Sequence, residues 1–516
     1  MDAPILTGFT LLACLSPLLT FATFWQVKEW RWDRLREEVI RERKFLPLVG
    51  GHIRPLITLL FLALFPILPT GSLLLAALGV LTLLNIVQIV LRKQRLPVWT
   101  TKAKTLVGTA LLLDVALAFV LSSSTPFALS VIFLPLFQSL SLGAAWAVFL
   151  PMDRHLKQKV MARAKARREA HPELMVIGIT GSVGKTTTKE LLAHIFNDRR
   201  PLFTPAHVNT EMGVAQWILK HLLPEPFPQG TPLIVEMGAY RTGEIVTLCS
   251  FVQPQIGMVT FIGNQHMALF GSQDALVKAK GELLQALPPT GHAFLNGDCG
   301  LCRDMQRFCS CPVTIVGTGG SDDLEAYDVE ETPTGIRFTV SGTPFSVPLH
   351  GTHNVVNVLL TIAVAEHLGM TKPAIAERIR TFQPPHRTFE VRQEQGITIL
   401  DDTHNSSAAS FKAAIAWAKT QPFEHKTLLT SGLIELGEEH QRTHRELGAL
   451  AAGVFRETIY LNRQSAPLFA EGFGKAVLPL TSQTPRVPDG SLLVCVGRMP
   501  PSTIQRLLPL PAPKTI

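Results

Sequence analysis

The stretch Gly178-Ile-Thr-Gly-Ser-Val-Gly-Lys-Thr186 decides the fold of the largest part of this chain. An apolar run from Met175 to Ile179 leads into it, and a segment of helical periodicity, Thr187 to Phe196, follows it. In a strand, loop and helix of this kind the glycines let backbone N–H groups surround phosphate oxygens, and the helix N-terminus adds its dipole. The sequence therefore predicts a phosphate-binding loop in an α/β domain.

The residues of this loop are suited to ATP and Mg²⁺. The ammonium of Lys185 supplies a point charge for the terminal phosphates, and the hydroxyl of Thr186 can ligate the metal. The pattern departs from the general one, because Ile179 stands where a glycine is usual and Gly178 comes one residue early. We predict that the nucleotide contacts Gly181, Ser182, Val183, Gly184, Lys185, Thr186 and Thr187.

Two α/β domains are predicted around and after this loop. Short apolar runs alternate with helical stretches, which is typical of an α/β fold with a mainly parallel sheet. We assign residues 174–383 to a central ATPase domain and residues 384–516 to a C-terminal, Rossmann-like domain. The runs expected to be strands are 233–237, 256–262, 293–295, 397–400, 427–430 and 492–496.

The first 150 residues have the pattern of an α-helical transmembrane bundle. Long uncharged apolar stretches of this kind are typical of membrane spans. The alternative is a hydrophobic domain buried within a soluble protein. We expect five spans, at residues 3–25, 55–69, 71–91, 105–122 and 127–150, followed by a basic linker at 151–173.

The distribution of charge orients this bundle. Residues 1–175 hold 20 Lys and Arg against 10 Asp and Glu, whereas the rest of the chain is close to neutral. The basic residues concentrate in the segments 28–54, 92–104 and 154–168, and basic loops face the cytoplasm. We therefore expect a multi-pass protein of the cytoplasmic membrane, with its N-terminus outside and its catalytic domains in the cytoplasm. The near-neutral soluble part predicts no nucleic-acid partner.

A series of motifs follows the phosphate loop in order along the chain. The loop and these motifs resemble the Mur ligase family, and most closely its D-alanyl-D-alanine-adding, MurF-type branch. The resemblance covers roughly residues 174–500 and leaves residues 1–150 outside it. The motifs are Asn209-Thr-Glu-Met-Gly213, Val235-Glu-Met-Gly238, Ala279-Lys-Gly-Glu282, His353-Asn-Val-Val-Asn357, Asp401-Asp-Thr-His-Asn405 and Glu435-Leu-Gly-Glu-Glu439.

The resemblance implies a set of metal ligands. It gives Glu236, at the end of an apolar strand, a place beside Thr186 at the magnesium ion. It implies that His266 and Lys280 hold a second magnesium, with Lys280 carbamylated by carbon dioxide. Relatives carry an acid two residues after this histidine, whereas this chain has Ala268. Read without the family, Glu236, His266 and Lys280 would be a strand end, a loop and a helix surface.

Further nucleotide contacts are implied from two later motifs. Asn354 and Asn357 lie three residues apart and so share one face of a helix, which the resemblance places against the adenine. Helix capping by these asparagines is the structural alternative. From the C-terminal domain the resemblance implies that Arg387 reaches ATP, that Asp402 lies beside the ribose and that His404 helps to hold the phosphate.

The activity implied is that of an ATP-dependent ligase that joins a carboxylate to an amine through an acyl phosphate. The catalytic residues would be Lys185, Lys280, His266 and Arg387. The expected partners are ATP, a carboxylate-bearing cell-envelope precursor, an amine donor and the lipid bilayer; the sequence names no protein partner. The closest match is D-alanyl-D-alanine addition in peptidoglycan synthesis. The alternatives are another amide ligase, of the poly-γ-glutamate type or acting on a lipid-linked precursor, and an ATP-driven membrane transporter.

Four of the seven cysteines lie close together at positions 299, 302, 309 and 311. Their spacing offers four sulfurs, the set that zinc takes in a tetrahedral site. The spacing is tighter than in common zinc motifs, and residues 301–308 have a helical pattern. We therefore favour small buried thiols over zinc for Cys299, Cys302, Cys309 and Cys311.

Overall fold

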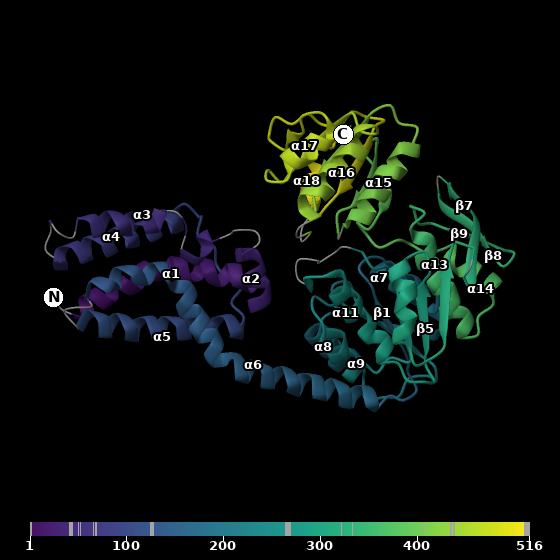
Figure 1. The fold of residues 1–516 in the computed structure, drawn as a ribbon, viewed down its shortest axis with the longest axis horizontal. Coiled ribbons are helices and arrows are strands. Elements are labelled where there is room, and N and C mark those ends of the chain that lie inside the picture. The colour runs from purple at the N-terminus through teal and green to yellow at the C-terminus, as the bar shows by residue number, and fades with distance from the viewer. Residues whose placement is uncertain are drawn as a thin grey trace, which may run out of the picture. The chain divides into compact units, whose positions relative to one another are not determined.

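Apolar helices form the first part of the chain, and the rest is built on two mainly parallel sheets with helices packed on them (Figure 1). The fold is that of a computed structural model. It describes all residues except 1–2, 41–44, 50, 52, 65–66, 68–69, 124–127, 264–269, 321, 333, 405, 434–435, 437–438 and 510–516. The chain divides into two compact units, Met1–Lys159 and Val160–Ile516.

Every regular element among the described residues of the first unit is a helix. Helix α1 packs against both α4 and α5, and its buried face includes Leu18, Phe21 and Trp25. The elements are α1 (Ala3–Val27), α2 (Trp32–Ile40), η1 (Leu46–Val49), α3 (Ile53–Ala63), α4 (Thr70–Val90), α5 (Thr101–Ser123), η2 (Ala128–Leu136) and α6 (Gln138–Glu169).

The described helices support fewer spans than the five expected. By length and composition α1, α4 and α5 could cross a membrane, and η2 with α6 would add a fourth if this pair, bent by 79°, counts as one span. Helix α3 has 11 residues, fewer than the 18 or so that a span needs. The basic segment that we expected to be a linker continues the helix α6 as far as Glu169.

The central domain is built on a nine-stranded sheet in the order β2-β3-β1-β4-β5-β6-β7-β8-β9, parallel as far as β7 and antiparallel from there to β9. Its elements are β1 (Met175–Thr180), α7 (Lys185–Ile195), η3 (Asn197–Arg199), β2 (Leu202–Phe203), α8 (Glu211–His221), β3 (Pro232–Glu236), α9 (Glu244–Val252), β4 (Ile256–Val259), α11 (Gln273–Gln285), β5 (His292–Asn296), α12 (Gly300–Arg303), η4 (Asp304–Phe308), β6 (Val313–Gly317), β7 (Leu324–Thr332), β8 (Gly335–Val340), β9 (Thr343–Val347), α13 (Asn354–His367) and α14 (Lys372–Ile379).

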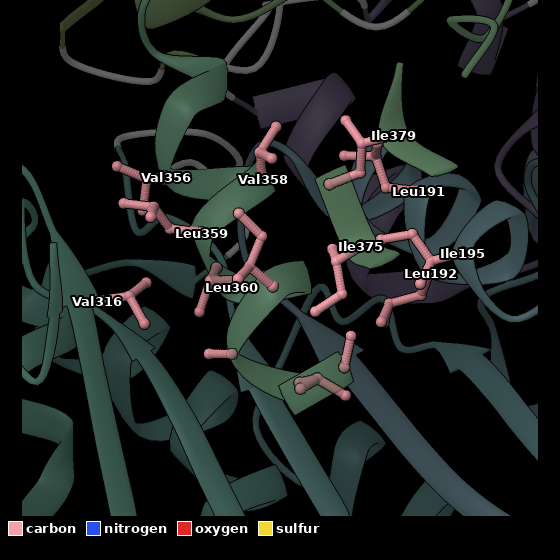
Figure 2. Close-up of a cluster of buried hydrophobic side chains, with 14 of the residues drawn as sticks. Leu191, Leu192, Ile195, Val316, Val356, Val358, Leu359, Leu360, Ile375 and Ile379 are labelled. Atoms are coloured by element: carbon pink, nitrogen blue, oxygen red, sulfur yellow. The ribbon is translucent and has the colours of Figure 1, made fainter. Parts of the chain in front are cut away.

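Helices cover both faces of this sheet because its strands alternate apolar side chains between two cores. On one face Ile177 and Ile179 of β1 pack with α7 and α13, and on the other Val176 packs with α8 and α9. Figure 2 shows part of the first core, in which Leu359 and Leu360 of α13 belong to one cluster with Leu192 and Ile195 of α7. The predicted α/β domain with a mainly parallel sheet is confirmed.

The C-terminal domain has a six-stranded sheet in the order β10-β11-β15-β12-β13-β14, and only the pairing of β10 with β11 is antiparallel. Alternating residues again fill two cores, with Leu400 on one face and Ile399 on the other. Its elements are β10 (Glu390–Glu394), β11 (Ile397–Asp402), α15 (Ala408–Thr420), β12 (Lys426–Thr430), α16 (His440–Ala452), β13 (Glu457–Tyr460), α17 (Ala466–Phe473), β14 (Leu478–Pro479), β15 (Leu492–Val496) and α18 (Pro501–Gln505).

Candidate active site

The phosphate loop joins β1 to α7 through two glycines with left-handed backbone. Gly181 has φ +147° and Gly184 has φ +88°, conformations that glycine adopts without steric cost. A Cβ at Gly184 would lie 2.3 Å from Oδ1 of Asn357, so this position has no room for a side chain. The loop is also held from the segment after β4, since the backbone N–H of Ser182 donates to the carbonyl of Phe261 at 2.6 Å.

Lys185 lies in the first turn of α7 with its ammonium over the loop. Its Nζ donates to the carbonyl oxygens of Gly181 at 2.8 Å and of Ser182 at 3.2 Å. Burial lowers the pKa of Lys185, and the carboxylate of Glu236 acts in the opposite direction. The ammonium therefore lies at the mouth of the loop, where phosphate oxygens would compete with the two carbonyls for it. Thr187 is buried in the same turn.

The carboxylate of Glu236 ends β3 next to the loop, because β3 pairs with β1 in parallel and Ile179 is opposite Glu236. The hydroxyl of Thr186 donates to its Oε2 at 2.9 Å, and Nδ2 of Asn209 donates to its Oε1 at 3.0 Å. A hydroxyl and a carboxylate are hard oxygen ligands, the type that Mg²⁺ prefers. These residues fit the predicted magnesium ion. Asn209 opens one of the motifs quoted above, but we had predicted no role for it in the site.

A second missed residue is Lys189, one turn further along α7. Its side chain is fully buried, and Nζ lies 3.9 Å from Oε2 of Glu236 and 3.1 Å from Oε1 of Glu190. The ammonium and the Glu236 carboxylate carry opposite charges and attract each other across this buried distance. In the sequence Lys189 follows Lys185 by one helical turn, which places it on the same face of α7.

Lys280 does not lie on a helix surface. It is buried on α11, and its Nζ donates to the carbonyl of Ala239 at 3.4 Å, the one hydrogen bond of this ammonium among the described residues. Burial first and the charge of Lys185 second lower the pKa of Lys280 to about 7. His266, the predicted companion ligand, lies outside the described residues, as does Ala268.

The neighbouring Glu282 has a structural role. Its carboxylate accepts hydrogen bonds from the backbone N–H groups of Gly243 and Val246, at 2.5 and 3.1 Å. These groups belong to the N-terminus of α9, where donors lack partners within the helix and a negative charge is favoured. The motif around Lys280 therefore also fixes α9 to α11.

Asn354 and Asn357 share one face of α13, as their spacing predicted. Nδ2 of Asn357 donates to Oδ1 of Asn354 at 2.9 Å, and Nδ2 of Asn354 donates to the carbonyl of His350 at 2.9 Å. The N-cap of α13 is His353, so neither asparagine caps this helix. Asn357 instead lies against Gly184 of the phosphate loop.

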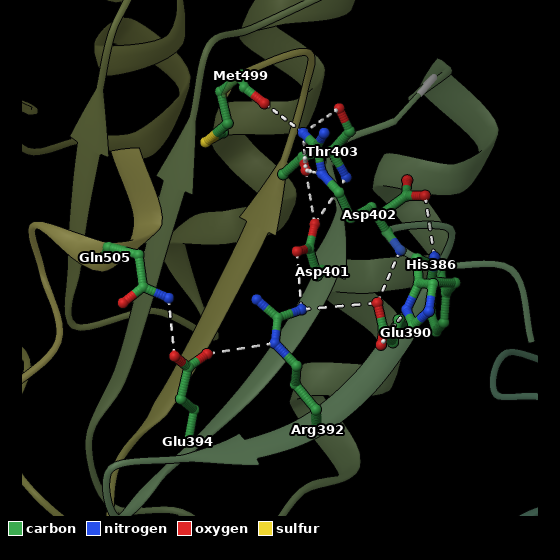
Figure 3. Close-up of polar contacts among 11 residues, drawn as sticks. His386, Glu390, Arg392, Glu394, Asp401, Asp402, Thr403, Met499 and Gln505 are labelled. Carbon is green, nitrogen blue, oxygen red and sulfur yellow. Dashed lines mark hydrogen bonds and ion pairs between the residues drawn. The ribbon is translucent and has the colours of Figure 1, made fainter. Parts of the chain in front are cut away.

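The predicted nucleotide contacts of the C-terminal domain are engaged within that domain. Nε of Arg387 donates to Oγ1 of Thr403 at 2.9 Å, and its guanidinium also donates to the carbonyl of Met499 (Figure 3). The carboxylate of Asp402 is only 4% exposed and accepts the backbone N–H of Phe389 at 3.2 Å. Burial raises the pKa of Asp402 to about 6.

His404 is the predicted residue that reaches the central domain. Its Nε2 lies 2.9 Å from Nε2 of His207, and the two rings stack with centroids 4.4 Å apart. Burial, the neighbouring His207 and the charges of Arg387 and Arg498 lower the pKa of His404, whereas Glu236 opposes them. His207 belongs to the loop that leads to Asn209, and no pattern in the sequence indicates that it pairs with His404.

The four clustered cysteines are distributed within a hydrophobic core. Cys299, Cys302 and Cys311 are buried there among Leu276 and Met305, and all described cysteines are free thiols. Among the described residues no three His, Cys, Asp or Glu side chains gather where they could hold a metal ion. The thiol of Cys299 donates to the backbone carbonyl of Ile262 at 3.6 Å.

Three comparisons bear on this site. Residues 179–365 match the Mur ligase middle domain. The UDP-N-acetylmuramoyl-tripeptide–D-alanyl-D-alanine ligase of Synechocystis sp. is 32% identical over 322 residues, which cover 62% of this chain and 68% of that protein.

Solved structures give the same fold. MurF from Acinetobacter baumannii has a TM-score of 0.60 at 24% identity, covering 66% of this chain and 77% of that chain. The MurF ligase from Thermotoga maritima in complex with ADP has a TM-score of 0.58 at 23% identity, covering 68% of this chain and 82% of that chain.

Proposed function

This chain belongs to the Mur ligase family, and from that premise we propose that it adds D-alanyl-D-alanine, or a similar amine, to the peptide carboxylate of a peptidoglycan precursor. It is an ATP-dependent ligase that forms C–N bonds. The observation that carries the proposal is the hydrogen bond of 2.9 Å from Thr186 to Glu236, which joins the phosphate loop to a carboxylate on the neighbouring strand β3.

The loop residues would bind the phosphates of ATP. Backbone N–H groups from Gly181 to Thr187 and the N-terminus of α7 would surround them, and Lys185 would turn from the two loop carbonyls to the terminal phosphate. Thr186 and Glu236 would hold Mg²⁺, which offsets negative charge on phosphate oxygens when bound. The ADP named with the Thermotoga maritima structure supports a nucleotide at this place. We assign Asn354 and Asn357 to the nucleotide side of the site.

The ligation would proceed in two steps. The acceptor carboxylate attacks the γ-phosphate and ADP leaves, which gives an acyl phosphate; the amine then attacks its carbonyl carbon, and phosphate leaves as the amide forms. His404 would take part on the phosphate side, because it lies against His207 and within the electrostatic influence of Glu236. Contact between the two domains at this pair would exclude water from the acyl phosphate.

Lys280 would contribute as a carbamate. An ammonium cannot ligate a metal ion, whereas a carbamate presents two oxygens and a negative charge. The burial of Lys280 supports this role, because desolvation of the ammonium favours the free amine, and it is the free amine that attacks the carbon of carbon dioxide. We assign it, with His266, to a second magnesium ion.

The apolar helices would place the enzyme in the cytoplasmic membrane. Helices α1, α4 and α5 support this assignment by length and composition. The names of the relatives describe ligases that act on a nucleotide-linked tripeptide. The family resemblance does not extend to residues 1–150 of this chain. We propose that this part holds the ligase near a lipid-linked acceptor.

The function can be tested with the full-length protein purified in detergent. Lipid-linked and soluble muropeptides are supplied as acceptors, each with a panel of amino acids and dipeptides as amine donors. We expect phosphate release that depends on the amine, an amide product with the mass of the D-alanyl-D-alanine adduct, and a higher kcat/KM for the lipid-linked acceptor. Another amine in the product would identify another amide ligase. Phosphate release that is independent of any amine would contradict ligation and favour a transporter, and equal use of both acceptors would contradict the lipid-linked one.

The proposed topology predicts that residues 154–168 face the cytoplasm. A single cysteine placed at Lys159 of a cysteine-free variant should react with a membrane-impermeant maleimide only after cells are permeabilised. A cysteine at Ser123, where the chain is predicted to be outside, serves as the matched control and should react in intact cells. Labelling of position 159 from outside intact cells would refute this orientation.

A further inference from the structure

Two loops of the C-terminal domain emerge side by side at the carboxyl ends of β11 and β15. The strands are parallel neighbours, with Asp402 opposite Val496. The backbone N–H of Gly497 donates to Oγ of Ser406 at 2.8 Å, which ties the second loop to the first. In parallel sheets of α/β domains, ligands bind at this end of the strands.

Arg387 fastens the same two loops from the other side. Its guanidinium donates to Oγ1 of Thr403, at 2.9 Å from Nε and 2.7 Å from one terminal nitrogen, and to the carbonyl of Met499. Its own backbone carbonyl accepts the N–H of His404 at 3.1 Å. All of these partners lie within the C-terminal domain, so this guanidinium is already engaged in holding the loops.

Arg498 lies between the two anchored positions Gly497 and Met499, and its side chain is exposed. Its guanidinium has no hydrogen bond or ion pair with any residue that the structure describes. Its charge acts on the imidazole of His404, which is 2.9 Å from His207 of the central domain. From His207 the chain leads directly to Asn209, which holds Glu236. An uncommitted guanidinium is thus presented at the end of the site where the reacting groups would lie.

We propose that Arg498 binds an anionic oxygen group of the substrates, and that Arg387 is a positioning residue that holds the two loops carrying His404 and Arg498. This inference rests on the proposed ligase function. A guanidinium offers paired donors that match a carboxylate or a phosphate. The group it binds is either the carboxylate of the amine donor or the phosphate that is transferred.

The test compares Arg498→Ala with Arg463→Ala in the full-length enzyme, after the wild type has been shown to ligate. Arg463 is a matched control, because it is an exposed arginine that follows β13 at the same edge of the sheet. We expect Arg498→Ala to lose at least about 30-fold in kcat/KM, the scale of one charged hydrogen-bonded contact, and Arg463→Ala to stay within about threefold of wild type.

Two amine donors are compared, one with a free C-terminal carboxylate and the other with that carboxylate converted to an amide. This comparison shows whether Arg498 binds the donor carboxylate or the phosphate. If Arg498 binds the donor carboxylate, the variant should have a raised KM for the free acid and lose the preference for acid over amide. If it binds the phosphate, kcat should fall equally with both donors. Activity of Arg498→Ala within about threefold of wild type with both donors would overturn the proposal, whereas a wild type that does not ligate would refute the proposed function itself.

Lysine substitutions separate the two arginines. Lysine keeps the charge but not the planar fork. Arg498→Lys should therefore recover part of the activity that Arg498→Ala loses. Arg387→Lys cannot bridge Thr403 and Met499 together, so we expect it to be as inactive as Arg387→Ala, with a lower Tm and an unchanged preference for acid over amide. Full activity of Arg387→Lys with loss of that preference in Arg387→Ala would show that Arg387 itself binds the anion.

Discussion

Replacing Lys185 with alanine is expected to reduce amine-dependent ligation by about 10³-fold or more. The ammonium stands at the mouth of the phosphate loop and contacts only the carbonyls of Gly181 and Ser182 among the described residues. During phosphoryl transfer it would stabilise charge that develops on the terminal phosphate, and the loss of one such contact in a dry site costs about 10² to 10³ in rate or more.

The same substitution should leave the fold intact. Lys185 is half-buried and packs against its own loop, so its removal opens no cavity in the core. We expect a Tm within a few degrees of wild type, together with loss of the stabilisation that ATP and Mg²⁺ give the wild-type protein in thermal unfolding. Lys220→Ala, an exposed lysine on α8, is the matched control and should behave as wild type. Turnover by Lys185→Ala at near-normal rates would refute the assignment of the phosphate loop.

Replacing Lys280 with alanine is expected to reduce ligation by at least about 100-fold. Removing groups that merely support a metal ligand typically costs 10- to 100-fold, so loss of a ligand should cost no less. Carbamylation joins the free amine to carbon dioxide and releases a proton. Burial and the charge of Lys185 lower the pKa of Lys280 to about 7, which makes the free amine more available at neutral pH than it is in an exposed lysine.

A carbamate at Lys280 predicts two results that an ordinary buried lysine does not predict. A short carboxylic acid at high concentration should restore part of the activity of Lys280→Ala, because it supplies the missing oxygens. Stripping bicarbonate and carbon dioxide from the buffer should lower the activity of the wild type. Lys278→Ala, two residues away on the exposed side of α11, should show neither effect. An alanine variant of Lys280 with near-normal turnover in carbon-dioxide-free buffer would refute the role.

The local patterns of the sequence were sufficient for much of the fold. The apolar runs at 175–179, 233–237 and 492–496 became β1, β3 and β15, because alternation and strand length are properties of a short segment. The spacing of Asn354 and Asn357 fixed their common helix face for the same reason. The membrane spans were predicted less well, since composition does not fix where a helix bends, as it does between η2 and α6.

The sequence by itself determined the type of the site. A glycine loop followed by Lys185 and Thr186, between a strand and a helix, is the arrangement that binds nucleotide phosphates and Mg²⁺. Which other side chains join them depended on contacts between segments far apart in the chain. Only the tertiary structure shows that Asn209 donates to Glu236 and that Lys280 is buried. It alone also shows that Arg387 donates to Thr403 and Met499, and that His207 contacts His404. The partners of a side chain depend on how whole helices and strands pack together, and the spacing of residues along the chain does not determine that packing.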